Sequence, residues 1–243
     1  MIEEPYRWID AVANRREYIS DQLKEGTPVF ALSRPEGIFL LGAGAGHSKV
    51  FEIYNRHAMA ALGHPVDIEK LRQAAIEAAH MEGFNRSPAD VTLRRLVNFA
   101  LSPTLKNAFE QVHAPPLIVE SLFAECGATP QEDLLVRLHF DGRFRVEEPG
   151  VCVVHVDGNA EEGARSWLQE RIRPEDPLRR VRGLCLLAWN ALVEEKNFST
   201  LVISDSLPEE IEGKELEMAL LDRNRSVALQ YQPLDENAEI LKA

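Results

Sequence analysis

Two side chains near the start of the chain have the types and positions that chemistry requires. Thr27 follows Gly26 where an apolar run begins. A threonine that becomes the first residue of a processed chain acts as a nucleophile, because its own α-amine then serves as the base. Lys49 is the only lysine or arginine between Arg34 and Arg56, so no nearby basic side chain competes with it for an anion. The segment therefore holds one candidate nucleophile and one candidate cation for binding a carboxylate.

The glycine-rich stretch 42–46, which reads GAGAG, lies between these two side chains. Dinucleotide-binding loops need the spacing GxGxxG and open onto a helix whose N-terminus faces the pyrophosphate. Here the spacing is GxGxG and a strand-like run follows, so we expect a flexible surface loop and no nucleotide cofactor. His47 is near Lys49 and could touch a ligand there, although a single loop histidine is usually only solvated.

Composition bounds the size and the partners of the protein. The chain has 243 residues, 45% of them hydrophobic, and shows no linker, which predicts a single domain over 1–243. Its formal net charge is -12. Because no basic patch breaks this acidity, we expect no nucleic-acid partner. No apolar run reaches the length of a membrane span, so we expect no membrane partner and a cytoplasmic location.

The cysteines indicate the redox environment. Cys126, Cys152 and Cys185 are an odd number and lie in apolar runs, as reduced thiols of a core do. Since no CxxC or histidine-rich spacing accompanies them, we expect no metal site and no cofactor.

Hydrophobic periodicity predicts the elements that must position these residues. A mobile arm over 1–5 precedes an amphipathic leading helix over 6–25, and a polar tail covers 235–243. Asp67 is expected to cap the second helix, and Pro103 to break the third near Leu101. The acidic stretch 205–217 is interpreted as a solvated loop. The predicted order is a helix over 6–25, strands over 29–32, 38–41, 50–54 and 58–62, helices over 67–83 and 87–112, strands over 117–126, 134–140, 143–146 and 151–156, helices over 160–172 and 177–193, and a hairpin over 216–221 and 227–231.

This order favours antiparallel sheets covered by helix pairs over strict βαβ alternation. Three segments then look like those of a proteasome alpha subunit of the bacterial, actinobacterial type. They are SKVFEIYNRHAMAALG at 48–63, DVTLRRLVNFALSPTLKNAFEQVHAPPLIVESLFAE at 90–125 and LEMALLDRNR at 216–225. The resemblance covers nearly the whole chain. It implies an α+β fold, a four-layer αββα sandwich of the N-terminal nucleophile hydrolase type, with an extra N-terminal helix.

The resemblance also implies partners and a role for Lys49. Alpha subunits form a ring from copies of themselves that caps proteasome beta subunits. In such rings a lysine at the start of the third strand accepts the C-terminal carboxylate of an activator's tail, from a ring-shaped ATPase or another activator. This role falls on Lys49, which makes the expected function that of a non-catalytic structural and gating subunit.

The residues argue against catalysis by this chain. Catalytic relatives carry an acid after the second strand, but no carboxylate lies between Glu36 and Glu52 here. Cleavage at Gly26 would also discard the leading helix, so Thr27 is interpreted as an ordinary residue at the start of a strand. Two alternatives stay open. One is a self-compartmentalising N-terminal threonine hydrolase that acts without separate beta subunits, and the other is a cytosolic binding module unrelated to proteolysis.

Overall fold

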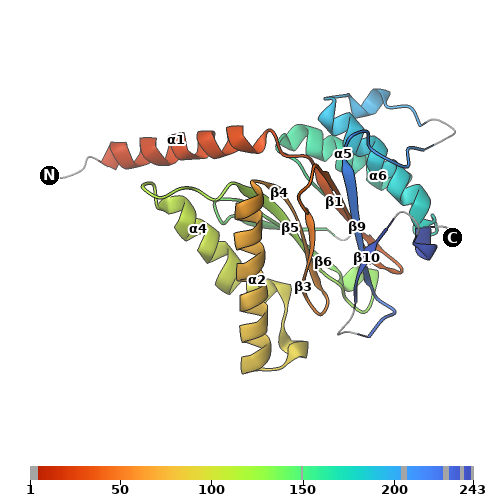
Figure 1. The fold of residues 1–243 in the computed structure, drawn as a ribbon, viewed down its shortest axis with the longest axis horizontal. Coiled ribbons are helices and arrows are strands. Elements are labelled where there is room, and N and C mark those ends of the chain that lie inside the picture. Colours follow the sequence, from red (N-terminus) through yellow and green to blue (C-terminus); the bar gives the residue numbers. More distant parts are fainter. Residues whose placement is uncertain (1–4, 149, 204–206, 227–229, 236–237, 242–243) are drawn as a thin grey trace.

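A computed structural model of the chain describes residues 5–148, 150–203, 207–226, 230–235 and 238–241 (Figure 1). Two five-stranded antiparallel sheets stack on one another, and helices cover the outer face of each. The expected four-layer αββα sandwich of the N-terminal nucleophile hydrolase type is thereby confirmed. Among the described residues, no helix is both long enough and apolar enough to cross a bilayer.

The first sheet has the strand order β10-β9-β2-β1-β8. The hairpin predicted around Pro35 joins β1 to β2, and Gly37 closes its turn at φ 150°. A Cβ at Gly37 would lie 1.9 Å from the carbonyl oxygen of Leu221, so only glycine fits there. The strands are β1 (Val29–Arg34), β2 (Gly37–Gly44), β8 (Val151–Val154), β9 (Glu215–Asp222) and β10 (Tyr231–Leu234).

The second sheet has the order β3-β4-β5-β6-β7. Its strands pair in chain order. Short connections join β3 to β4, β5 to β6 and β6 to β7, whereas the helical segment over 65–110 separates β4 from β5. The strands are β3 (Val50–Tyr54), β4 (His57–Gly63), β5 (Val119–Glu125), β6 (Leu134–Leu138) and β7 (Phe144–Glu147).

The central strands β1, β2, β4 and β5 are buried on both faces, which explains their nearly continuous apolar runs in the sequence. In β1, Phe30 and Leu32 face α5 (Gly158–Arg171) and α6 (Leu178–Val193), whereas Val29 and Ala31 face the second sheet. The second sheet is covered on its outer side by α2 (Pro65–Asn85), α3 (Leu93–Leu96) and α4 (Ser102–Glu110). Small side chains between the sheets allow close stacking, among them Ala31, Ala58, Ala60, Ala124 and Ala219.

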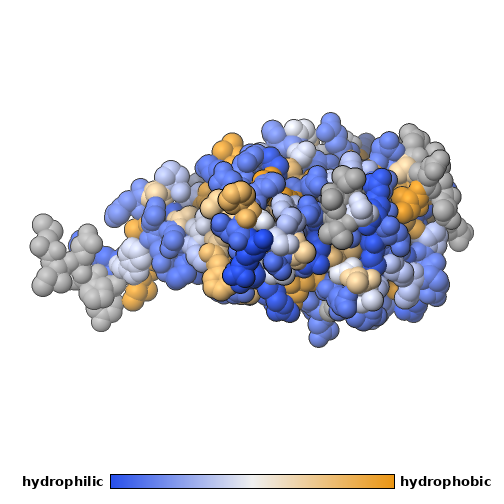
Figure 2. Space-filling view, turned by 90° about the horizontal axis from the view of Figure 1, so that it is seen from below, coloured by the Kyte–Doolittle hydropathy of each residue, from blue (hydrophilic) through white to orange (hydrophobic). Residues whose placement is uncertain are grey.

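The leading helix α1 (Pro5–Leu23) extends beyond the sandwich (Figure 1). Its C-terminal end inserts Ile19 and Leu23 between the sheets, where both are almost fully buried. Its other end leaves Trp8 and Ile9 at least half exposed. Hydrophobic residues are visible on this projecting part of the surface (Figure 2). The helix therefore presents apolar side chains that the single chain does not cover.

Several local expectations are corrected by the structure. The second helix begins at Pro65, with His64 as the N-cap, because proline at the first helical position presets φ. Asp67 instead accepts a hydrogen bond from the Ile118 amide (3.1 Å). The break near Leu101 takes the form of a π-helical turn over Val97–Leu101.

The ends of the chain also differ from expectation. The expected arm over 1–5 falls on residues 1–4, which lie outside the described part, and on Pro5, which is already helical. The last strand covers Tyr231–Leu234, while residues 227–229 of the expected strand lie outside the described part. The segment expected to be a polar tail includes a 3₁₀ turn at Glu239–Leu241, whose Leu241 is buried against the core.

Candidate functional site

Lys49 lies immediately before β3, and its side chain runs across the glycines of β2. A Cβ at Gly42 would lie 3.2 Å from the Cβ of Lys49, and one at Gly44 would lie 3.4 Å from its Cε. The glycines therefore leave the space that the lysine stem occupies. This corrects the expectation of a flexible loop over 42–46, because Gly42–Gly44 is a buried part of β2.

The ammonium group of Lys49 reaches the segment before β1. Its Nζ donates to the carbonyl oxygen of Thr27 at 3.1 Å. The Thr27 hydroxyl donates in turn to the carbonyl oxygen of Ala43 at 2.5 Å. Thr27 and Lys49 are thus brought together, but the hydroxyl is held by a backbone acceptor. This is the arrangement of a structural threonine.

Glu217 of β9 fixes the backbone beneath Lys49. Its Oε2 accepts hydrogen bonds from the amides of Lys49 (2.8 Å) and Val50 (3.1 Å). The carboxylate thereby ties the start of β3 in one sheet to β9 in the other. Sequence reasoning missed this contact: Glu217 fell both in the acidic stretch interpreted as a solvated loop and in the strand predicted over 216–221, and its partner strand is distant in sequence.

The electrostatics of this lysine favour anion binding. Burial lowers the pKa of Lys49, Glu217 raises it and Lys214 lowers it to a smaller extent, so that the pKa is about 8. The group is therefore mainly protonated at neutral pH but poorly solvated. A carboxylate that approaches it recovers part of the lost hydration as a charge-assisted hydrogen bond.

A small hollow of about 190 Å³ opens beside the Lys49 ammonium. Its volume equals that of about six water molecules, which suits a carboxylate and part of one residue. The hollow lies between the end of α1 and the first turn of α2, and its lining includes Gly26, Thr27, Gly44, His47, Lys49 and Lys214. His47 is exposed at its edge. The arrangement can bind a small anionic group, and the hydroxyl of the candidate nucleophile Thr27 is already engaged by a backbone acceptor.

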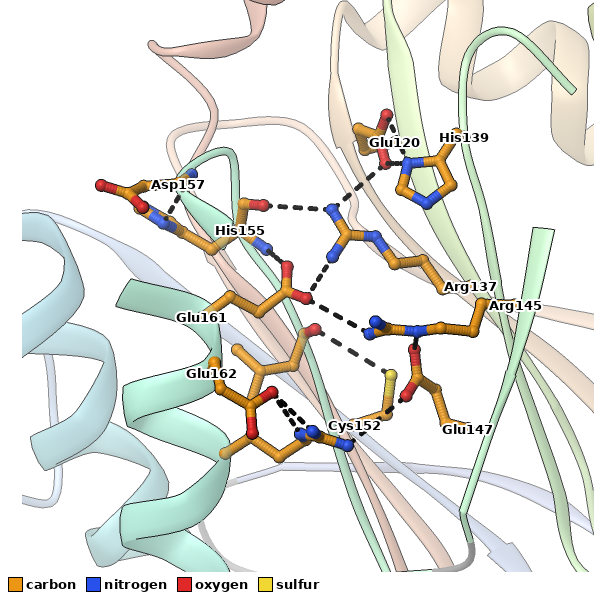
Figure 3. Close-up of polar contacts among 12 residues, drawn as sticks. Glu120, Arg137, His139, Arg145, Glu147, Cys152, His155, Asp157, Glu161 and Glu162 are labelled. Carbon is orange, nitrogen blue, oxygen red and sulfur yellow. Dashed lines mark hydrogen bonds and ion pairs between the residues drawn. The ribbon is translucent and has the colours of Figure 1, made fainter. Parts of the chain in front are cut away.

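A second polar cluster lies where β6, β7 and α5 meet (Figure 3). Arg137 pairs with Glu161, at 3.5 Å with Glu120, and donates to the carbonyl oxygen of His155 at 3.2 Å. The carboxylate of Glu161 also accepts from the His155 amide (3.0 Å), although burial raises its pKa. The sequence feature that could have indicated this cluster is a charged residue, Arg137, within an otherwise apolar strand.

This cluster is closed, because the side chains of Arg137, Glu120 and Glu161 are each at most 10% exposed. Burial also raises the pKa of Cys152 well above its usual value, so this thiol is not a nucleophile. The cysteines expected to be reduced core thiols are all free and buried. We therefore regard the cluster as a brace between β6 and α5.

A third polar contact joins the two sheets near the C-terminal end of β1, where Ser33 lies. Arg223 forms two parallel hydrogen bonds, each of 2.9 Å, with the carboxylate of Asp133. The Ser33 hydroxyl also donates to this carboxylate at 2.5 Å. Both charged side chains are almost fully buried, so each needs the other as a partner of opposite charge.

Four stacked layers with an added N-terminal helix define the class of the protein, an αββα sandwich of the N-terminal nucleophile hydrolase type. No family model matches the chain. Among curated proteins, the chain is 35% identical over 215 residues to "Proteasome subunit alpha" of Actinosynnema mirum, covering 87% of this chain and 76% of the relative. It is 34% identical over 217 residues to the protein of the same name from Streptomyces scabiei, covering 88% and 81%.

A third relative, "Proteasome subunit alpha" of Thermomonospora curvata, is 32% identical over 214 residues, which cover 87% of this chain and 85% of the relative. Agreement of this extent, over nearly the whole length of both proteins, goes beyond a shared fold. The chain belongs to the proteasome alpha subunit family.

Proposed function

We propose that this protein is a non-catalytic structural and gating subunit of a cytoplasmic proteasome core particle. Copies of the chain form an outer ring that packs on beta subunits and controls substrate entry. The Lys49 pocket docks the C-terminal tails of a ring-shaped ATPase or another activator. The observation that carries the proposal is the Lys49 ammonium, which burial leaves poorly solvated at the wall of a hollow sized for a carboxylate.

The docking role follows from the chemistry of that ammonium. The amide of Lys49 donates a hydrogen bond to Glu217, and the lysine stem can lie along β2 because Gly42 and Gly44 lack side chains. A C-terminal carboxylate offers the charge and the small size that the hollow admits. Binding there contacts the segment that joins α1 to β1, and through it the helix that projects from the sandwich. Tail docking can thereby bias an entrance formed by the N-terminal ends.

The substitution Lys49→Ala tests this role. It is expected to abolish activator-stimulated degradation while the assembly of rings, followed by native mass and electron microscopy, stays unchanged. Lys196→Ala is the matched control, since Lys196 is a surface lysine beyond the end of α6 and away from the hollow. Unaltered stimulation in the Lys49 variant would show that the docking assignment is wrong.

The catalytic alternative is disfavoured by what surrounds Thr27. Cleavage between Gly26 and Thr27 would remove α1 and with it Ile19 and Leu23 from the layer between the sheets. Burial of such side chains contributes about 1.5–3 kcal/mol each. N-terminal sequencing of the mature chain separates the two functions, since a hydrolase would start at Thr27. Cleavage of small peptides by the purified chain alone, lost on Thr27→Ala, would overturn the non-catalytic assignment.

A binding module unrelated to proteolysis remains the third function to test. The exposed Trp8 and Ile9 on the projecting α1 favour assembly with further chains. A monomeric native mass, with and without a beta partner, would contradict the ring and support the binding module.

A further inference from the structure

A second hollow adjoins the Lys49 pocket and differs from it in charge. It is shallow, has a volume of about 680 Å³ and shares Ala45 and Lys214 with the pocket. Three carboxylates line it, those of Glu210, Glu212 and Glu215. We call these three residues, together with Glu25 on the opposite side of the Lys49 pocket, the acidic rim.

Three carboxylates of the rim, those beside the second hollow, form no ion pairs among the described residues. Glu210, Glu212 and Glu215 are exposed, and none of them forms an ion pair within the described part of the chain. The neighbouring Glu209 differs, because it pairs with Arg179. The rim is therefore a local concentration of negative charge and not a set of neutralised pairs.

The position of the rim is set by the fold. Ile211, between two of these glutamates, is 7% exposed and belongs to the core cluster under α6. Gly213 then adopts φ 68°, and the Lys214 amide donates to the Ile211 carbonyl oxygen at 3.2 Å. This turn holds Glu212 beside the hollow while it returns the chain to β9. The acidic rim is thus a fixed feature next to the pocket.

A tail held at Lys49 can extend into the adjoining hollow, because the two hollows share Ala45 and Lys214. With its carboxylate at Lys49, an extended tail rises by about 3.3 Å per residue, so its fourth and fifth residues from the end lie roughly 10–17 Å from the carboxylate. Glu210 and Glu212 line that adjoining hollow, and Glu25 lines the Lys49 pocket itself. A tail that leaves the Lys49 pocket toward the adjoining hollow therefore passes from a cationic floor to a negative edge.

We infer that the Lys49 pocket selects peptide tails whose terminal carboxylate is preceded, about four to five residues upstream, by basic side chains. This specificity rests on the proposed docking function. Opposite charges between the tail and the acidic rim favour binding and speed the encounter, whereas an acidic tail is repelled. Lys214 lies between the two hollows and favours the carboxylate end of the tail, so the charge pattern also sets the direction in which the tail lies.

The test uses fluorescein-labelled eight-residue peptides that end in Leu-Tyr-Ala with a free carboxylate. The fourth and fifth residues from the end are two lysines, two glutamines or two glutamates. Fluorescence anisotropy measures their affinity for the full-length chain in the largest assembly it forms. At low salt, the lysine peptide is expected to bind about three- to tenfold more tightly than the glutamine peptide, and the glutamate peptide more weakly than both. High salt is expected to compress these differences.

Matched variants assign the preference to the rim. Glu210→Gln with Glu212→Gln is expected to remove most of the lysine preference. Glu77→Gln with Glu175→Gln changes the net charge equally at exposed sites outside both hollows and is expected to preserve it. An equal loss in both double variants would overturn the rim assignment, since the overall charge of -12 would then be responsible.

The same peptides separate this inference from the docking function. Equal affinities of the three free-acid peptides, with binding that is still lost on Lys49→Ala or on amidation of the terminus, would overturn the inference and leave the docking function intact. Binding that is insensitive to both changes would overturn the docking function itself.

Discussion

The substitution Lys49→Met is expected to stabilise the isolated chain while it removes tail docking. Methionine retains the length and the flexibility of the lysine stem, so it can lie over Gly42 and Gly44 as the lysine does. It lacks only the ammonium group. The comparison therefore measures what the buried charge costs the folded state.

The pKa of Lys49 sets the size of this effect. A fall from the usual 10.5 to about 8 corresponds to about 3 kcal/mol by which the folded state disfavours the charged form. Because the side chain is half-buried, solvent screening reduces this figure. The lost hydrogen bond to Thr27 offsets about 1 kcal/mol more. We expect a net gain of about 1–2 kcal/mol in the free energy of unfolding at pH 7.

The pH dependence of this gain provides the sharper test. Between pH 8 and 10.5 the folded chain releases the Lys49 proton while the unfolded chain still holds it. The unfolded state then binds more protons, so the stability contributed by the Lys49 group rises with pH across this window. The advantage of the methionine variant is thus full at pH 7 and shrinks as the pH approaches 10.5.

Urea unfolding of both proteins at pH 7, 8, 9 and 10, followed by circular dichroism, gives the difference in the free energy of unfolding. Lys106→Met serves as the control, since Lys106 is an exposed residue of α4 that pairs with Glu110. A methionine variant that is less stable than the parent at pH 7, or a difference that is independent of pH, would refute the view of Lys49 as a poorly solvated charge.

Two further substitutions test the framework around the pocket. Glu217→Ala leaves the amides of Lys49 and Val50 unpaired and is expected to cost about 1–3 kcal/mol of unfolding free energy in a denaturant titration. It should also weaken tail binding in the anisotropy assay, and unchanged affinity would exclude Glu217 as a positioning residue. Asp133→Ala leaves the buried Arg223 guanidinium without its partner and is expected to cost about 3–5 kcal/mol. Adding Arg223→Met should recover part of this loss, and a cost of under about 1 kcal/mol for Asp133→Ala alone would contradict the buried pair.

Most of the layered fold could be predicted from the sequence, because periodicity reports which residues share a face. The hairpin at Gly37 was predictable because its turn residues, a proline and a glycine, are neighbours in the chain. Helix starts were less accurate. Asp67 has the side chain of a capping residue, but Pro65 begins the helix and the carboxylate binds the distant Ile118 amide. Capping rules consider only neighbours along the chain, so they cannot predict a hydrogen bond to a residue that is distant in sequence.

The candidate site divides in the same way. Lys49 was predicted from its isolation among apolar residues and from the family resemblance. The roles of Gly42 and Gly44 were not predicted. A run of glycines is typical of a loop, and only the structure shows that the Lys49 side chain lies across these two. The buried pair of Arg137 and Glu161 was also missed, since its members come from a strand and from a helix that are separated in the chain.

The sequence by itself determined the apolar runs that build four layers, the absence of a carboxylate between Glu36 and Glu52, and the single lysine at the start of the third strand. These are properties of neighbours along the chain. Only the tertiary structure decided that the Thr27 hydroxyl donates to the carbonyl oxygen of Ala43 and that the Glu217 carboxylate accepts from the amide of Lys49. The physical reason is the antiparallel register of β2 with β9 and the stacking of the two sheets, which bring distant segments within hydrogen-bond reach.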